Sequence, residues 1–198
     1  MPDKALHRFF LSIVVPTISA IALFILTILV VILPTFEQNI MAKKKEMIAE
    51  LTNTAYSLLE EYHQENINGN YSIEDAQKMA AHRIEQIRYG GENKDYFWII
   101  DKHPFMIMHP YRAELINSDL TTYTDGAGKR LFVEATLVVA KKGEGFINYM
   151  WQWKDDSTRI VPKLSYVKGF EPWGWIIGTG IYLEDVKQEI QGLKKHLI

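Results

Sequence analysis

Two side chains in the second half of the chain have the chemistry to bind a small anion. Lys163 stands in the segment PKLSY, just before the apolar residues 164–167, and His109 stands in the segment MHPY. A carboxylate that leaves water needs a cation and several hydrogen-bond donors in place of its hydration shell. We therefore expect Lys163 to hold the anion and His109 to donate to it. The alternative interpretations are a strand-end lysine that faces solvent and a histidine that makes a local hydrogen bond.

Aromatic residues surround these two side chains in the sequence. All five tryptophans lie between Trp98 and Trp175. In the segment GFINYMWQW, strand alternation places Tyr149, Trp151 and Trp153 on one face. Tyr149 and Trp151 have polar ends that seek partners when buried, so we expect them to form pocket walls, with Trp153 nearer the rim. The alternative is ordinary packing of these rings against a helix.

Four further aromatic residues are candidates for the same pocket. Tyr166 supplies a second hydroxyl donor, and Tyr111 follows His109 closely enough to close the mouth of the pocket. In the segment DYFWI, alternation separates Phe97 from Trp98, and the sequence does not decide which of the two faces the ligand. Phe97 and Trp98 therefore both remain candidate ligand contacts.

Several functional classes have no support in the sequence. The absence of cysteine excludes disulfides, zinc–thiolate sites and cysteine nucleophiles. A net charge of −2 without a long basic patch argues against nucleic-acid binding. His103, His109 and Asp101 flank a tight turn with no further ligand set, so no metal is expected. The GTG segment at 178–180 stands inside a predicted strand, which indicates close backbone packing and no phosphate loop. With no cofactor loop, nucleophile–base pair or paired carboxylates, we expect no cofactor and no enzyme activity.

The N-terminal part predicts a membrane anchor. Residues 9–33 include no charged side chain, and a helix of about 25 residues can cross a bilayer. A cleaved signal peptide is the alternative, but its apolar core would be shorter, about 7–15 residues, and a small-residue cleavage site would follow it. We therefore expect a transmembrane helix over residues 9–33, preceded by an N-terminal segment at 1–8 and ended by Pro34. Basic residues on both sides of this helix leave its orientation undecided.

The remaining residues predict an α+β domain with a five-stranded antiparallel sheet and a long N-terminal helix. One long helix is expected over about 37–64, and a second helix begins after the Ser72 cap and ends at Gly90. Arg88 at the end of this second helix is an alternative anion contact, although pairing with the helix dipole explains it more simply. Predicted strands cover 96–100, 105–109, 145–153, 159–167 and 173–182, with a helix at 129–142 and a last helix from Glu184. The long helix covers one face of the sheet, and residues 111–142 cover the other and roof a cavity.

Several separate segments, in order, give the chain a resemblance to a known family. They resemble the single Cache domain, a PAS-like extracellular sensor module of bacterial chemoreceptors and sensor kinases. The resemblance covers about 35–189 and rests on DYFWI, MHPY, DGAGKRLF, GEGFINYMW and PKLSYVKGFEPWGWIIGTGIYLEDV. The chain most resembles the Cache domains of methyl-accepting chemotaxis proteins that bind short carboxylates such as acetate, propionate, lactate or pyruvate.

The resemblance implies an arrangement in the cell. Residues 1–8 would be cytoplasmic, the single helix would cross the bacterial inner membrane, and the sensor domain at 35–189 would lie in the periplasm, paired with a second copy. Residues 190–198 would lead to a second membrane segment or end the chain. The alternatives are a stand-alone accessory membrane protein that binds a protein partner, and the sensor of a histidine kinase or a diguanylate cyclase.

Overall fold

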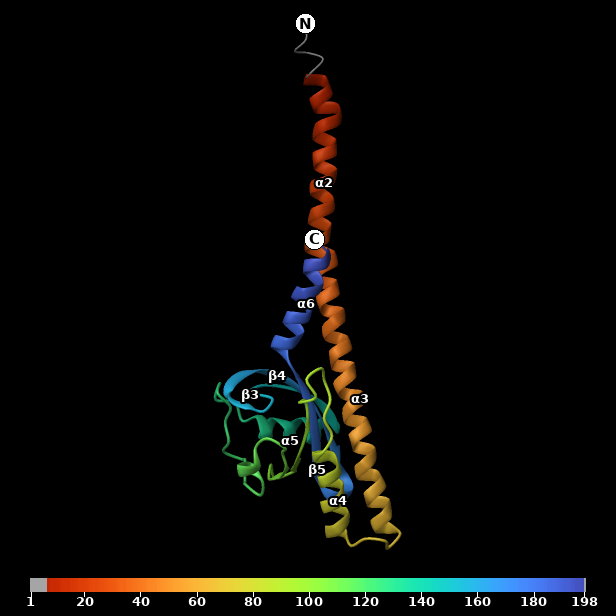
Figure 1. Cartoon of the computed structure of the whole chain (residues 1–198), viewed down its shortest axis with the longest axis vertical. Helices are drawn as coiled ribbons and strands as arrows, with labels where there is room; N and C mark the ends of the chain where they lie inside the picture. The colour runs from red at the N-terminus through yellow and green to blue at the C-terminus, as the bar shows by residue number, and fades with distance from the viewer. Residues whose placement is uncertain (1–6, 198) are drawn as a thin grey trace. The chain divides into compact units, whose positions relative to one another are not determined.

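The computed structural model describes residues 7–197, and the chain divides into two compact units, at residues 1–43 and 44–198. The first unit is helical throughout its described residues (Figure 1). A π-helical turn, η1 (Phe10–Val14), is followed by α2 (Val15–Thr27), a second π-helical turn, η2 (Ile28–Ile32), and the start of α3 (Leu33–Ile67).

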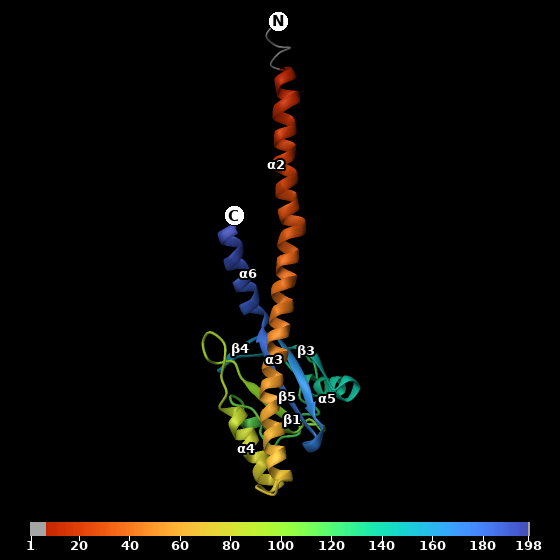
Figure 2. The same cartoon turned by 90° about the vertical axis from the view of Figure 1, so that its right-hand side faces the viewer.

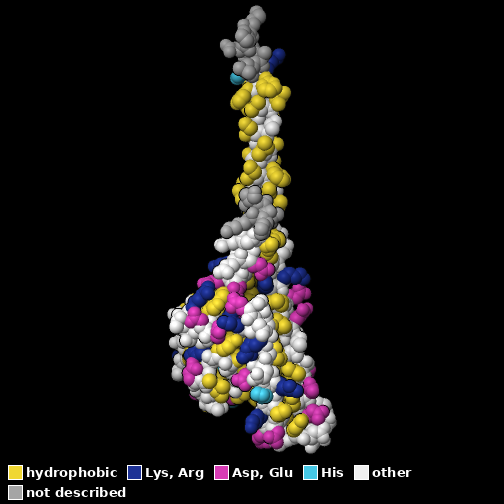
Figure 3. Space-filling model, in the orientation of Figure 1, with side chains coloured by type: hydrophobic (Ala, Val, Ile, Leu, Met, Phe, Trp, Pro, Cys, Tyr) yellow, Lys and Arg dark blue, Asp and Glu magenta, His cyan; other side chains and the backbone are white. Residues whose placement is uncertain are grey.

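Apolar side chains surround the helix of the first unit (Figure 3). An 18-residue window within His7–Ile67 has a mean hydropathy of 2.7 with none of it buried. The hydroxyls of Thr17 and Thr27 donate to the carbonyls of Ile13 and Leu23, so they satisfy their polarity inside the helix. This helix is long and apolar enough to cross a membrane.

No helix boundary falls at Pro34, and the end of the membrane-spanning part at this residue stays a prediction. Pro34 is the second residue of α3, which continues to Ile67. Pro34 therefore lies inside a helix that runs without a break from His7 to Ile67. The π-helical turn η2 directly before α3 provides the irregular hydrogen bonding that lets the chain continue through this residue.

The second unit is built on the expected five-stranded antiparallel sheet, with the strand order β2-β1-β5-β4-β3. The strands are β1 (Phe97–Asp101), β2 (Met106–Met108), β3 (Glu144–Trp153), β4 (Asp156–Phe170) and β5 (Trp175–Tyr182). Trp173, expected in the last strand, lies instead in the 3-10 turn η4 (Glu171–Trp173). Gly174 follows it with a φ of 64°, which turns the chain from β4 into β5.

Helices cover both faces of this sheet (Figures 1 and 2). The part of α3 beyond Lys44, together with α4 (Ile73–Glu85), packs on one face. The helix α5 (Leu131–Lys142) and the segment 111–130, which includes the 3-10 turn η3 (Ala113–Leu115), pack on the other. We call these the α3 face and the α5 face. The buried residues of the α3 face are Ala55, Leu59, Ala80, Ile84, Phe97, Ile99, Met108, Phe170, Trp175 and Ile177.

The boundaries of two helices follow from their caps. The Ser72 hydroxyl accepts the N–H of Asp75 at 3.1 Å, as its predicted cap requires. However, α4 ends at Glu85 and not at Gly90, because residues beyond it extend to let Tyr89 bridge to Asp95. Arg88 donates to the carbonyls of Glu85 and Ile87 at this helix end, which confirms the simpler interpretation of that residue. The last helix, α6 (Leu183–Leu197), begins directly after β5.

Candidate functional site

The candidate site lies on the α5 face of the sheet. The register pairs Lys163 of β4 with Tyr149 of β3 on one side and with Tyr182 of β5 on the other. Paired residues in an antiparallel sheet point to the same face, so these three side chains share the α5 face. Strand alternation adds Trp151 from β3, and Trp98 of β1 pairs with Gly178 on this face as well.

Lys163 is fully buried in this face. Its side chain is 1% exposed, and its Nζ lies 4.0 Å from the ring centroid of Tyr96 and 4.8 Å from that of Tyr182. Among residues 7–197 it forms no ion pair with a carboxylate. Burial lowers the pKa of Lys163 to about 7, against an opposing effect of the Asp95 charge. The interpretation as a solvent-facing lysine is therefore wrong, and the side chain is a buried cation that lacks a close anionic partner.

His109 is a neutral hydrogen-bond donor beside this lysine. It is 2% exposed, and its ring lies 4.9 Å from the ring of Tyr96 and 5.6 Å from that of Trp151. Burial holds the pKa of His109 well below its usual value, and the charge of Lys163 lowers it further. Nδ1 accepts the N–H of Tyr111 at 3.1 Å, so the ring proton must sit on Nε2. The local hydrogen bond proposed as an alternative therefore exists, and it directs the remaining donor into the site.

Buried donors without partners gather on this face. Within the described part of the chain no hydrogen-bond partner exists for four buried atoms here, namely Tyr96 Oη, Trp98 Nε1, His109 Nε2 and Trp151 Nε1. Burial raises the pKa of Tyr96, and the nearby Trp151 indole lowers it slightly, but the geometry of this pair falls short of a hydrogen bond. Native proteins leave few buried polar groups unpaired, so such a cluster requires an explanation. A group with several acceptor oxygens would satisfy these donors.

The segment after His109 closes the site. The ring of Tyr111 stands edge-on to Tyr96 at 5.0 Å, and its hydroxyl donates to the Lys94 carbonyl at 3.1 Å. The same hydroxyl accepts from Arg88 Nε at 3.2 Å. These contacts support the predicted position of Tyr111 at the mouth, because they hold its ring over buried donors.

A hydrogen bond to Asp125 connects the rest of this covering segment to β3. The Asp125 carboxylate accepts the N–H groups of Ala127, Lys129 and Met150 at 2.9, 2.8 and 2.7 Å. These hydrogen bonds lower the pKa of Asp125 against the opposing effect of burial. The segment 111–130 thus covers donors that are buried beneath it.

The glycines of the GTG segment permit close packing, as predicted. A Cβ at Gly178 would lie 2.5 Å from the Trp98 ring, so only glycine lets this indole lie flat on β5. A Cβ at Gly180 would collide with the Ser165 hydroxyl. That hydroxyl shares a hydrogen bond of 2.8 Å with Tyr149. Both glycines therefore shape the floor of the site.

The structure brings six of the eight predicted residues together and separates the other two. His109, Lys163, Tyr149, Trp151, Tyr111 and Trp98 meet on the α5 face. Tyr166 points to the opposite face, where its ring stands edge-on to that of Phe146 with 4.9 Å between the ring centroids. Phe97 also lies on the α3 face, 5.6 Å from the ring of Tyr89. Alternation along each strand imposes both positions, so neither side chain faces the candidate site.

Several residues at this site were not predicted from the sequence. Tyr96 and Tyr182 flank the Lys163 ammonium, Arg112 lies 5.3 Å from the Trp151 ring, and Asp95 acts on the charge of Lys163. Tyr96 shares a strand face with Trp98, and that alternation was the signal available for it. Tyr182 is placed by strand pairing with Lys163, and Asp95 by its isolated bridge to Tyr89, and one sequence reveals neither.

Comparison with known proteins agrees with this geometry. A family model described as single Cache domain 2 matches residues 40–195. The methyl-accepting chemotaxis protein McpP of Pseudomonas putida is 38% identical over 146 residues, which are 74% of this chain and 26% of that protein. The sensor histidine kinase MctS of Rhizobium johnstonii is 32% identical over 152 residues, which are 77% of this chain and 32% of that protein. The chain thus spans about a quarter to a third of the length of these relatives.

Two solved structures share the fold of the second unit. One is described as the structural basis for carboxylic acid recognition by a Cache chemosensory domain. It has a TM-score of 0.69 at 39% identity, and the alignment covers 73% of this chain and 97% of that one. The other is a periplasmic sensor domain of a chemotaxis protein. Its TM-score is 0.68 at 34% identity, and the alignment covers 72% of this chain and 96% of that one.

Proposed function

Since the chain belongs to the single Cache domain 2 family, we propose that it is a sensor that binds a short carboxylate on the α5 face of its sheet. One observation carries this proposal: a buried lysine without an ion pair among the described residues faces a cluster of buried donors that lack partners. An acceptor-only group with a negative charge is the ligand that such a set requires.

Each residue of the site has a different role in binding the carboxylate. Lys163 supplies the charge, and Nε2 of the neutral His109 donates one hydrogen bond. The hydroxyl of Tyr96 and the indole N–H groups of Trp98 and Trp151 are the further donors in reach of the same space. Their rings provide apolar contact for a short carbon chain. A solved structural neighbour is described as recognising a carboxylic acid, which supports acids of the acetate, propionate, lactate or pyruvate type.

The proposal includes transmission across a membrane. The helix of the first unit anchors the chain in the inner membrane, and the second unit lies in the periplasm, as a related periplasmic sensor domain supports. The strand β5 ends at Tyr182, against the Lys163 ammonium, and α6 begins at the next residue. Ligand binding therefore shifts the equilibrium between different positions of α6 relative to the sheet. Two copies of the chain pair in the membrane and transmit this change together.

The output of the sensor is that of a chemoreceptor in this proposal, because McpP shares 38% identity. The relative MctS favours a second candidate, the sensing part of a histidine kinase. Joining the chain to each kind of cytoplasmic domain and measuring methylation or phosphorylation with and without ligand distinguishes the two outputs.

Binding is tested by titrating the full chain in lipid nanodiscs with acetate, propionate, lactate and pyruvate while the melting temperature is measured. A ligand present at about 100 times its Kd stabilises the folded state by about 2.7 kcal/mol, which is a clear shift in Tm. Propylamine, which has the carbon chain without the carboxylate, is the matched ligand control. A Tm that none of the four acids raises contradicts the carboxylate assignment.

A further inference from the structure

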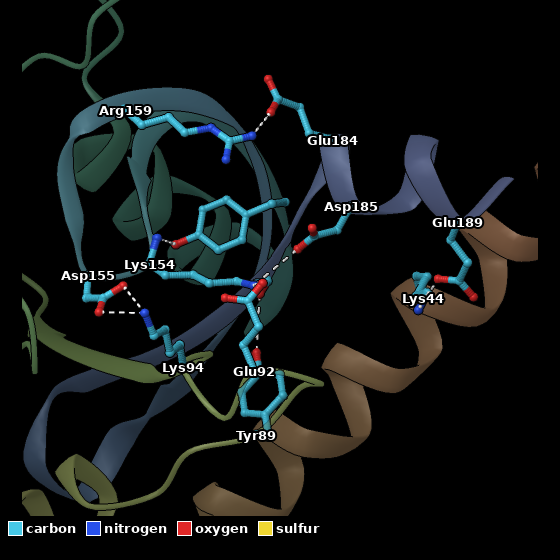
Figure 4. Close-up of polar contacts among 12 residues, drawn as sticks. Lys44, Tyr89, Glu92, Lys94, Lys154, Asp155, Arg159, Glu184, Asp185 and Glu189 are labelled. Atoms are coloured by element: carbon cyan, nitrogen blue, oxygen red, sulfur yellow. Dashed lines mark hydrogen bonds and ion pairs between the residues drawn. The ribbon is translucent and has the colours of Figure 1, made fainter. Parts of the chain in front are cut away.

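Three acidic residues in the first half of α6 form ion pairs with the rest of the domain (Figure 4). Glu184 pairs with Arg159 of β4 at 2.5 Å, and Glu189 pairs with Lys44 of α3 at 2.7 Å. Between them, Asp185 pairs with Lys154 at 3.7 Å. The three basic partners differ in burial: the side chains of Arg159 and Lys44 are 43% and 29% exposed, whereas that of Lys154 is 5% exposed. Solvent screens the outer pairs most, so the pair with the buried lysine is the one that depends most on its surroundings, although Asp185 itself is 42% exposed.

Two backbone hydrogen bonds and a ring contact hold Lys154 in place. It has a φ of 51° in the turn between β3 and β4, a conformation that costs a non-glycine residue energy. Its N–H donates to the Tyr182 hydroxyl at 2.7 Å, and its carbonyl accepts from Gln152 at 2.8 Å. Its Nζ also lies 4.8 Å from the ring centroid of Trp153. The surrounding residues therefore fix the backbone of Lys154 to Tyr182 and Gln152, while its ammonium lies beside the Trp153 ring.

Two connections join Lys154 to the candidate site. The first is Tyr182, whose hydroxyl holds the Lys154 N–H and whose ring faces the Lys163 ammonium at 4.8 Å. The second is Glu92, which pairs with Lys154 at 3.1 Å and belongs to the loop 89–95 (Figure 4). In the same loop the carbonyl of Lys94 accepts from Tyr111, which closes the site.

Space for rearrangement exists beside these connections. A cavity of about 330 Å³ lies between the loop and the start of α6, with Asp95, Lys154, Tyr182 and Asp185 among its lining residues. Burial raises the pKa of Asp95, and the charges of Lys154 and Lys163 both oppose this rise. One carboxylate thus acts on the lysine of the site and on the lysine that holds α6. A cavity at this point allows side chains to move without the cost of breaking a packed core.

We propose that Lys154 is the positioning residue through which occupation of the site changes the attachment of α6. This inference rests on the proposed function. Without ligand, Tyr182 connects the two lysines, because its ring faces the Lys163 ammonium and its hydroxyl accepts the N–H of Lys154. A bound carboxylate draws the Lys163 ammonium away from the Tyr182 ring, so Tyr182 shifts and Lys154 shifts with it into the cavity beside Asp95. Lys154 moves away from Asp185, and the first turn of α6 loosens.

The test measures hydrogen exchange of the α6 amides in the full chain in nanodiscs, with and without propionate. In the wild type we expect propionate to speed exchange at residues 184–189 by about fivefold or more, the size of a typical coupling between sites. Lys154→Met is expected to bind propionate as the wild type does but to show no ligand-dependent change in α6. The matched control is Glu184→Gln, which breaks the exposed pair with Arg159 in the same turn; within residues 7–197 neither partner forms an ion pair or hydrogen bond with the loop 89–95, so this variant should keep the full response.

Two further measurements separate the possible failures. Asp185→Asn removes only the α6 partner of Lys154 and should also abolish the response, so it replaces Lys154→Met if that variant does not fold. A wild-type response in both variants overturns the role of Lys154. A propionate-induced rise in Tm without any change in α6 exchange overturns the coupling alone. If no carboxylate raises the Tm of the wild type, the proposed function fails and the coupling fails with it.

Discussion

The two faces of one sheet are built for different tasks. On the α3 face, Leu59, Ile84 and Ile177 are completely buried among other apolar side chains. On the α5 face, the same strands present a buried ammonium, a neutral imidazole and several indole and phenol groups. Two buried atoms on the α3 face, His63 Nδ1 and Trp173 Nε1, also lack hydrogen-bond partners among the described residues. However, no described residue on that face is a buried lysine.

The difference shows how a small domain combines stability with binding. Apolar burial on the α3 face favours folding in proportion to the area removed from water. A buried amine with unpaired donors on the α5 face opposes folding, because these groups lose hydrogen bonds to water without replacing them. In the proposed function, the same unsatisfied groups would give a carboxylate its binding energy. Mutations on the two faces should therefore change different measured quantities.

The largest effect is expected from a cavity in the α3 face. Leu59→Ala removes a fully buried side chain between α3 and the sheet and should lower the free energy of unfolding by about 2–5 kcal/mol. Urea denaturation measures this loss. Propionate affinity below the unfolding transition should stay unchanged, and a large fall in affinity would contradict the separation of the two faces.

Removal of the Lys163 ammonium from the α5 face should lower carboxylate affinity and raise stability, whereas Leu59→Ala lowers stability and keeps the affinity. Lys163→Met keeps the length of the side chain but removes its charge, so carboxylate affinity should fall by about 1.5–3 kcal/mol, the contribution of a charged hydrogen bond. The Tm without ligand should rise, because a buried charge is lost. The control is Lys168→Met in the same strand, whose lysine pairs with Glu144 and Asn53 away from the site. Unchanged affinity of Lys163→Met would place the ligand elsewhere.

The pH dependence of binding and of stability should run in opposite directions. The pKa of Lys163 is about 7 in the unliganded protein, so a carboxylate bound above pH 7 must take up a proton with it. Its affinity should be constant below pH 7 and fall by up to about tenfold per pH unit above it. Folding stability should rise over the same range, because the unfolded lysine, with its ordinary pKa of 10.5, holds the proton more tightly.

Calorimetry across pH 6–9 measures this decline in affinity. His109 stays neutral throughout this range, since burial holds its pKa well below its usual value. Titration of Lys163, and not of His109, is therefore expected to control the affinity. Affinity of the Lys163→Met variant should not depend on pH here, and a persistent decline would assign the titration to another group.

The smallest effect is expected from a pair of neighbouring aromatic residues. Trp98→Phe removes one buried N–H donor from the α5 face and should weaken carboxylate binding by about 1 kcal/mol, while Phe97→Leu on the α3 face should leave affinity unchanged. Titration calorimetry compares the two variants. Equal losses for both would show that the faces are not independent.

Much of this organisation was predictable from the residues. The apolar run at 9–33, the cap at Ser72, the order of helices and strands, and the packing role of the GTG segment all follow from local rules of length, periodicity and steric fit. The candidate contacts His109 and Lys163 were identified from their chemistry, from the aromatic segments around them and from the family resemblance. The end of α4 was predicted wrongly, because the chain leaves the helix after Glu85 so that Tyr89 can bridge to Asp95.

The sequence by itself determined the two kinds of unit, the sheet, and the residue types needed to hold an anion, because each depends on neighbours along the chain. Only the tertiary structure decided which side of β1 faces the site, that Tyr166 does not, and that Tyr96 and Tyr182 enclose the Lys163 ammonium. It also decided that Lys154 joins the loop 89–95 to α6. These facts depend on the register between strands far apart in sequence, and a shift of one residue would reverse every assignment.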